Sequence, residues 1–179
     1  DWGISGPKRS WWYKIQLFNP AHHAGPLLYF DLDTVIVDNI DWVWQQSLTY
    51  FWAVRDFKYL WRPTSTVVNS SVMWWNTERY AQVWNQFVQQ DLAHFIQKYR
   101  GDQDYISDAI PESQRSFFDS RRVQSWRWQC LDGGYDFQRQ QHRAPATSTQ
   151  IDPNVSIVIF HGNPKPTDVQ DPIILNHWR

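Results

Sequence analysis

The chain has 179 residues, with 17 Lys and Arg against 18 Asp and Glu, and a formal net charge of −1. This length suits one domain with its own core, and the balanced charge gives no case for general nucleic-acid binding. The single cysteine excludes an internal disulfide and fits a reducing compartment. The sequence has no apolar run of about 18 residues and no basic-then-apolar leader, so we expect a cytoplasmic protein without a transmembrane segment.

Apolar runs along the chain predict strands and helices in alternation. Ser10 can cap a short helix that ends at Phe18. Thr77 can cap a long helix that ends at about Tyr99, because apolar and aromatic residues recur between these two positions at a period of about 3.6. A further short helix is expected over 104–110. The strand candidates are 27–30, 50–54, 67–75, 123–129 and 155–160. This alternation predicts an α/β fold, and the many tryptophans are expected to fill its core.

Two carboxylates, Asp31 and Asp33, follow the first strand candidate. The apolar run before them has the length of a fully buried strand, and alternate strand residues share one face, so both carboxylates should lie on the same side. Ligands of open α/β sheets bind at this end of the strands, and a divalent cation with oxygen ligands would relieve the repulsion between the two groups. The alternative is a strand that ends in a polar turn with two solvated carboxylates.

The last strand candidate leads into a second polar motif, His161-Gly162-Asn163-Pro164-Lys165-Pro166. A histidine is a good ligand for manganese-like ions beside carboxylates, and a lysine close after a glycine suits a phosphate contact. The glycine permits close approach of the backbone to a ligand. Together with the acidic pair, this motif predicts a metal–diphosphate site.

The chain resembles the retaining GT-A glycosyltransferases of family 8, which include glycogenin, galactinol synthases and bacterial lipopolysaccharide galactosyltransferases. The resemblance implies a Rossmann-like mixed sheet flanked by helices, as a single domain over residues 1–179. Family members carry a first nucleotide-binding βαβ segment before the part seen here, so we expect a fragment that lacks its N-terminal part. The matching blocks, in the family's order, are Trp12 to Phe18, Leu28 to Thr34, Asn69 to Met73, Gly101 to Asp104 and Phe160 to Pro166.

The resemblance also implies roles at the phosphate side of a nucleotide-sugar donor, with UDP as the nucleotide. Three side chains would bind Mn²⁺ or Mg²⁺, which would bridge the diphosphate: Asp31, Asp33 and His161. Three further residues would contact the diphosphate: Lys165, Gly162 and Lys14. A divalent ion and a lysine would both stabilise the negative charge that grows on the leaving diphosphate.

At the sugar side, the resemblance implies a different set of residues. Oxygen atoms of Asp102 and Gln103 would stabilise the oxocarbenium character of the sugar, with Gln103 close to the anomeric carbon. Three residues would face the transferred sugar: Asp56, Asn69 and Ser70. The leaving phosphate oxygen could take the acceptor's proton, so no strong general base is required. The acceptor, a glycan, a lipid-linked molecule or a protein, is not indicated.

Each of these roles has an alternative. Lys14 could lie on the solvated face of its helix. Asn69 and Ser70 could form a bulge or a turn between two strands, and Asp102 could cap the helix that follows. The polar stretch 131–153 is predicted to be a long loop. This loop could act as a lid or contact the acceptor, with Arg139, His142 and Arg143 as the contacting residues.

Two other classes of function stay open. An inactive or truncated transferase domain could bind a glycan or a partner through its tryptophans without turnover. The run from Phe30 to Val35 also resembles the nucleophile motif of haloacid-dehalogenase-type phosphatases, in which Asp31 would attack phosphate. The glycine expected after the second aspartate of that motif is absent.

Overall fold

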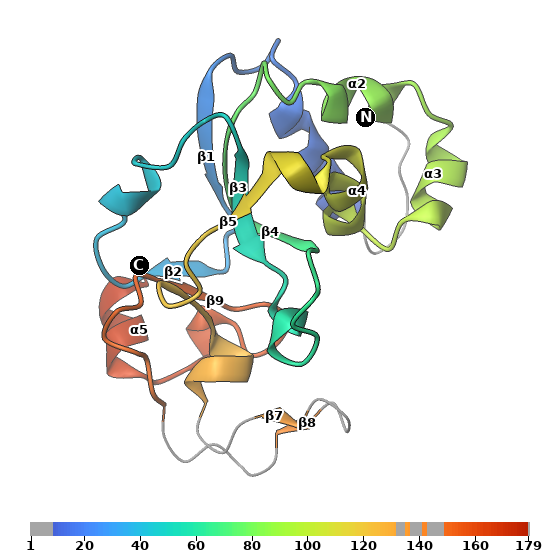
Figure 1. Cartoon of the computed structure of the whole chain (residues 1–179). Helices are drawn as coiled ribbons and strands as arrows, with labels where there is room; N and C mark the ends of the chain where they lie inside the picture. The colour runs from blue at the N-terminus through green and yellow to red at the C-terminus, as the bar shows by residue number, and fades with distance from the viewer. Residues whose placement is uncertain (1–8, 132–134, 137–140, 143–148, 179) are drawn as a thin grey trace. The chain divides into compact units, whose positions relative to one another are not determined.

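The structure is a computed structural model that describes residues 9–131, 135–136, 141–142 and 149–178 (Figure 1). The chain folds into two compact units. Unit 1 comprises residues 1–29, 47–56 and 66–117, and unit 2 comprises residues 30–46, 57–65 and 118–179. Each unit has its own sheet and is described separately below. The single domain expected over residues 1–179 stays a prediction.

Unit 1 is built around a four-stranded sheet in the order β1-β4-β3-β5. Strand β3 pairs antiparallel with β4 and parallel with β5. The strands are β1 (Pro26–Phe30), β3 (Phe51–Arg55), β4 (Val68–Asn76) and β5 (Arg115–Phe117). Strand β4 is central and is buried along its length up to Asn76. Strand β1 was expected to be fully buried, which is wrong: it is the edge strand and all its residues keep some exposure.

The pairing of β3 with β4 contains an irregularity at the polar part of β4. Ala53 pairs with Met73 and Val54 pairs with Asn69, so the register shifts across residues 70–72. A β-bulge of this kind re-aims the side chains that it carries. The irregularity at Asn69 and Ser70 agrees with the bulge alternative, whereas a turn between two strands is wrong, because both residues lie within β4.

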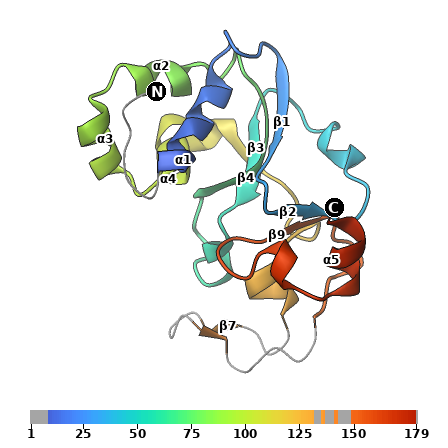
Figure 2. The ribbon, with the colours of Figure 1, turned by 180° about the vertical axis from the view of Figure 1, so that it is seen from behind.

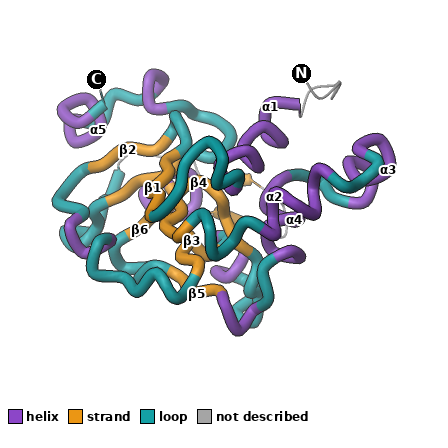
Figure 3. Tube along the Cα trace, turned by 90° about the horizontal axis from the view of Figure 1, so that it is seen from above, coloured by secondary structure: helices purple, strands orange, loops and turns teal. Residues whose placement is uncertain are grey.

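Four helices gather beside this sheet (Figures 2 and 3). They are α1 (Arg9–Trp12), which continues as a 3₁₀ helix over Tyr13–Phe18, α2 (Gln82–Val88), α3 (Leu92–Lys98) and α4 (Asp102–Ala109). The short helix that ends at Phe18 is confirmed, but Ser10 lies within α1 and is not its cap. The long helix from Thr77 to Tyr99 is wrong, because the chain turns between α2 and α3. Thr77 is no helix cap: its hydroxyl donates to the carbonyl oxygens of His23 and Gly25, at 2.7 and 3.1 Å.

The break between α2 and α3 follows from the packing of two phenylalanines. In one continuous helix Phe87 and Phe95 would be about 12 Å apart along the axis. Their ring centroids lie 5.2 Å apart, and both rings contact the buried Trp12, at 6.0 and 5.4 Å. Trp75 is also fully buried and stacks on Phe18 at 4.8 Å. Tryptophans therefore do contribute to the core, as predicted.

Unit 2 contains a three-stranded sheet in the order β2-β9-β6. The strands are β2 (Thr34–Ile36), β6 (Val123–Ser125) and β9 (Ile157–Ile159). The central β9 is fully buried and pairs antiparallel with β2 and parallel with β6. Strand β6 is shorter than predicted, because the chain passes into a π-helical turn over Trp126–Cys130.

The remaining elements of the chain are short. Helix α5 (Pro172–His177) begins after Asp171, whose carboxylate accepts from the amides of Ile173 and Ile174. A small antiparallel ladder joins β7 (Tyr135–Asp136) to β8 (Gln141–His142). Single 3₁₀ turns occupy Asp41–Val43, Phe57–Leu60, Glu112–Gln114 and Pro166–Asp168. None of the helices in the described ranges is both long and apolar enough to cross a membrane.

The predicted loop over 131–153 is described only in part. An isolated bridge pairs Leu131 with Thr149 across it. Arg139, Arg143 and the side chain of His142 lie outside the described residues. Their role as a lid or acceptor contact stays a prediction.

The only cysteine of the chain, Cys130, provides a test of the packing of unit 2. Its side chain is fully buried, and this burial, with a smaller contribution from the Asp171 carboxylate, raises the pKa of the thiol to about 12. In the unfolded chain the thiol pKa is about 8.5. Folding thus favours the protonated thiol. The contribution of this thiol to the free energy of unfolding is complete below a pH of about 8.5 and is lost as the pH rises toward 12.

We therefore expect Cys130 to resist iodoacetamide at pH 8 in the native protein and to react fully in concentrated urea. Mass spectrometry of the intact protein measures both rates. Equal rates with and without urea would show that unit 2 is not packed around this residue.

Candidate functional site

The predicted site residues divide between the two units. Unit 2 carries Asp31, Asp33, His161, Gly162 and Lys165. Unit 1 carries the others, which are Lys14, Asp56, Asn69, Ser70, Asp102 and Gln103. Each group is described within its own unit.

The two aspartates of unit 2 lie in a turn. The amide of Thr34 donates to the carbonyl oxygen of Asp31 at 3.1 Å, and Leu32 between the aspartates is 92% exposed. Strand β1 ends before this turn, so alternation along a strand does not decide how the carboxylates point. The turn is held in unit 2 by the amide of Phe160, which donates to the carbonyl oxygen of Asp33 at 3.0 Å. The prediction of a polar turn is thus confirmed for the backbone.

Lys165 contacts this acidic turn directly. Its Nζ atom donates to Oδ2 of Asp33 at 2.6 Å, across 132 positions of the sequence. The backbone around Lys165 is fixed by Asp168, whose carboxylate accepts from the amide of Lys165 at 2.8 Å and whose amide donates back at 2.9 Å. Gly162 has a φ of +80°, which a residue with a side chain rarely adopts. The two motifs of the predicted metal–diphosphate site therefore meet.

His161 is packed between aromatic rings next to this loop. Its ring stacks on Phe57 with centroids 5.3 Å apart, and the ring of Trp128 packs against it in a T-shaped arrangement with centroids 4.3 Å apart. The Nε2 atom of His161 is 2.6 Å from the hydroxyl of the fully buried Ser125. No pattern in the sequence indicates these three neighbours of His161.

The donor set of Asp31, Asp33 and His161 is chemically suited to Mn²⁺ or Mg²⁺. However, no three His, Cys, Asp or Glu side chains among the described residues are grouped so that they could hold a metal ion. Asp33 is paired with Lys165, and Nε2 of His161 is paired with Ser125. Metal binding by these residues stays a prediction.

In unit 1, three of the predicted residues form a buried polar cluster. Nζ of Lys14 donates to Oγ and to the carbonyl oxygen of Ser70, at 3.0 and 3.3 Å, and lies 3.3 Å from Oδ2 of Asp102. The hydroxyl of Ser70 donates to the same Oδ2 atom at 2.6 Å. The side chains of Lys14 and Asp102 are only 11% and 5% exposed. The alternative that Lys14 lies on a solvated helix face is therefore wrong.

The first turn of α4 presents Asp102 and Gln103. Gly101 is the N-cap residue of α4, so Asp102 does not cap this helix, and its carboxylate bonds with Ser70 and Lys14. A carboxylate in the first turn is favourable because of the helix dipole. Oε1 of Gln103 is buried and has no hydrogen-bond partner among the described residues. Gln103 therefore offers an acceptor atom that the fold does not use.

The remaining predicted residues of unit 1, Asn69 and Asp56, take part in hydrogen bonds with the backbone. Oδ1 of Asn69 accepts from the amide of Ser71 at 3.0 Å. Asp56 follows β3 and is 9% exposed, and its amide donates to the carbonyl oxygen of Val67 at 2.9 Å. Sugar binding by Asp56, Asn69 and Ser70 stays a prediction.

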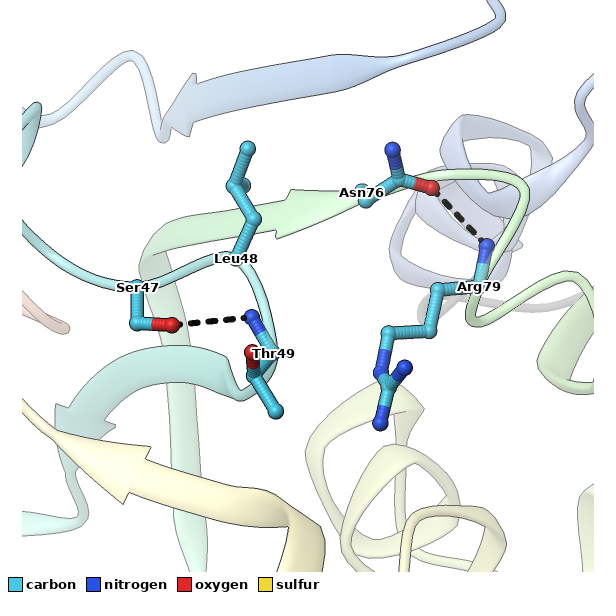
Figure 4. A pocket seen from close by; sticks show the side chains of 5 residues that line it. All are labelled: Ser47, Leu48, Thr49, Asn76 and Arg79. Carbon is cyan, nitrogen blue, oxygen red and sulfur yellow. Dashed lines mark hydrogen bonds between the residues drawn. The ribbon is translucent and has the colours of Figure 1, made fainter.

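Unit 1 also has a shallow cavity of about 390 Å³, which none of the predicted site residues lines (Figure 4). Its lining residues are Ser47, Leu48, Thr49, Asn76 and Arg79. Within it, Oγ of Ser47 accepts from the amide of Thr49, and Oδ1 of Asn76 accepts from the amide of Arg79. The cavity is polar and lies at the end of β4 away from Ser70.

Comparison with known proteins identifies the fold. No family model matches the chain, and no curated protein matches its sequence. Among solved structures, it is similar to the bifunctional glycosyltransferase WbbM, with a TM-score of 0.59 and 13% identity over 90% of this chain and 33% of WbbM. The chain therefore has a mixed α/β architecture with open mixed sheets and helices that is similar to the fold of this glycosyltransferase, and the predicted α/β fold class is confirmed.

Two structures of LgtC are also similar. One is an active-site mutant, with a TM-score of 0.53 and 13% identity over 92% of this chain and 62% of LgtC. The other is the galactosyltransferase LgtC in complex with donor and acceptor sugar analogs, with a TM-score of 0.50 and 14% identity over 91% and 61% of the two chains. The chain thus spans less than two thirds of the length of each of these proteins. At such identities the likeness concerns the fold, and membership of family 8 and the absence of an N-terminal segment stay predictions.

Proposed function

We propose that the chain is a glycosyltransferase domain that moves a sugar from a UDP-sugar to an acceptor, with retention and with Mn²⁺ or Mg²⁺ as cofactor. The observation that supports this most strongly is the contact between Lys165 and Asp33. It joins an acidic turn and a His-Gly-x-x-Lys loop in a chain with a glycosyltransferase fold. Both motifs carry the charges that a metal-bound diphosphate needs.

At the phosphate side, Asp31, Asp33 and His161 would hold the cation, which would act as a Lewis acid on the diphosphate. Lys165 would neutralise charge on the leaving nucleotide. Gly162 would let the backbone approach the phosphates closely, because it has no side chain. Lys14 would contribute a second positive charge near the diphosphate and the sugar.

At the sugar side, the carboxylate of Asp102 and the amide oxygen of Gln103 would stabilise the positive charge that develops at the anomeric carbon. The free Oε1 atom of Gln103 supports this role. Polar atoms of Asp56, Asn69 and Ser70 would bind sugar hydroxyls. The leaving phosphate oxygen would accept the proton of the acceptor, which is a glycan, a lipid-linked molecule or a protein.

A second function has its own support. Asp33 and His161 are both engaged with other side chains, and no three-residue metal cluster occurs in the described part of the chain. This favours a transferase-like domain that binds a glycan or a partner without turnover. In that case the acidic turn and the loop of Lys165 would serve to stabilise unit 2.

Turnover separates the two functions. The protein is incubated with a panel of UDP-sugars and Mn²⁺, UDP release is measured, and the released sugar is followed by NMR, with EDTA as the control. Cation-dependent release of UDP from one or a few of the sugars is expected for the transferase. Tight UDP binding without any release, over the whole panel and with added acceptors, would support the binding module instead.

A further inference from the structure

The polar cavity of unit 1 lies away from the residues proposed for sugar transfer. Asn76 ends β4 and follows Ser70 along this strand, by up to about 20 Å at a rise of about 3.3 Å per residue. Figure 4 shows Ser47 and Thr49 on one side of the cavity and Asn76 and Arg79 on the other. Its volume of about 390 Å³ falls within the range of about 300–1,000 Å³ that is usual for sites of small molecules. The cavity can therefore hold a small ligand of its own.

The cavity presents hydrogen-bond donors that the fold does not use. Oγ of Ser47 accepts from the amide of Thr49 at 3.3 Å, and Oδ1 of Asn76 accepts from the amide of Arg79 at 2.9 Å. Within the part of the chain that the structure describes, no group accepts a hydrogen bond from the hydroxyls of Ser47 and Thr49 or from Nδ2 of Asn76. The acceptor of Asn76 is thus occupied, and its donor atom is left for a ligand.

Arg79 adds a positive charge to these donors. The exposed arginines Arg100 and Arg121 each pair with a carboxylate at 2.7 Å, whereas Arg79 forms no ion pair with any residue of the described ranges. Burial raises the pKa of the Tyr80 phenol, and the neighbouring Arg79 guanidinium opposes this rise. The Tyr80 hydroxyl donates to the carbonyl oxygen of Thr49 at 3.1 Å. The guanidinium is therefore directed toward the Thr49 side of the cavity.

We propose that this cavity binds a small organic anion through its carboxylate or phosphate group, with Arg79 as the charged partner. A guanidinium can donate to two oxygens of such a group at once, and these charge-assisted hydrogen bonds are stronger than neutral ones. The hydroxyls of Ser47 and Thr49 and Nδ2 of Asn76 would donate to the remaining oxygens. A neutral ligand would leave the charge of Arg79 without a partner. This inference does not rest on the proposed transfer reaction.

Three ligands with one sugar ring and different charges test the inference. The ¹⁵N-labelled protein is titrated, without metal, with glucuronate, glucose 6-phosphate and glucose, and the amides of Thr49 and Arg79 are followed by NMR. At least one of the two anions should shift both amides in a saturable way, and the stronger of them identifies the group that is bound. Glucose should bind at least about tenfold more weakly, because it lacks the charged hydrogen-bond acceptor. Equal affinity for glucose would overturn the inference.

Two variants probe the cavity without a change in its backbone contacts. Arg79→Met should lower the affinity for the anion at least about tenfold. Asn76→Asp keeps an oxygen that can accept from the amide of Arg79, but it places a negative charge in the cavity, so it should lower the affinity by a similar factor. The spectra of both variants report at the same time whether the fold is retained.

Arg121→Met is the control for charge, because Arg121 is an exposed arginine of unit 2 that pairs with Asp119. It should leave the affinity unchanged. An equal loss in Arg121→Met and Arg79→Met would show a general effect of charge and would overturn the inference. An anion that shifts Gly162 but neither Thr49 nor Arg79 would bind at the loop of Lys165, which would support the proposed diphosphate contact and contradict a site in this cavity.

Discussion

Replacement of Lys14 by methionine is expected to lower the free energy of unfolding by about 3–5 kcal/mol, which is the usual cost of removing one partner from a buried ion pair. The Asp102 carboxylate would remain 5% exposed and would keep only the hydroxyl of Ser70 as a partner from the cluster. Methionine has nearly the length of lysine, so little packing is lost. Urea unfolding followed by circular dichroism measures the difference.

Two further variants show whether the charge is the cause. In Lys14→Met/Asp102→Leu both charges are absent, so most of the lost stability should return. Lys98→Met removes a lysine from an ion pair whose side chains are both 60% exposed, and it should leave the urea midpoint close to that of the wild-type protein. A loss below about 1 kcal/mol for Lys14→Met would contradict the buried cluster.

Trp12→Ala is expected to destabilise unit 1 by about 3–5 kcal/mol, because the fully buried indole leaves a cavity. The ring contacts both Phe87 of α2 and Phe95 of α3, so its loss also removes a contact that the two helices share. The neighbouring Trp11 is a matched control. It is 48% exposed, and Trp11→Ala should cost about 1 kcal/mol or less. Equal midpoints in urea for the two variants would show that the core is not arranged around Trp12.

Local patterns predicted most of the elements, and they failed where distant contacts decide the structure. The apolar runs that became β3, β4 and β9 were found because each is long or strongly apolar. The period of about 3.6 between residues 77 and 99 is real, but it does not report a chain reversal. The aromatic residues on both sides of the break pack against Trp12, which lies far away in the sequence. Only the polar run Gln89-Gln90-Asp91 marked the turn.

The candidate site shows the same division. The motifs of Asp33 and Lys165 were expected to belong together, and they are in contact. The engagement of His161 by Ser125 could not be predicted, because the two residues are brought together by the parallel pairing of β6 and β9. The burial of Lys14 likewise depends on the bulge in β4, which directs Ser70 toward it. Spacing along the chain carries no information about such contacts.

The most direct test of the central claim is calorimetric titration of UDP into the protein, with Mn²⁺ and then with EDTA. We expect UDP to bind in the presence of Mn²⁺ and to lose at least about 100-fold in affinity in EDTA and in Asp33→Asn, because the cation bridges the diphosphate to the acidic turn. Asp108→Asn, which removes an exposed carboxylate of unit 1, is the control for a general loss of negative charge. UDP affinity that is the same in Mn²⁺, in EDTA and in Asp33→Asn would contradict a metal–diphosphate site at this position.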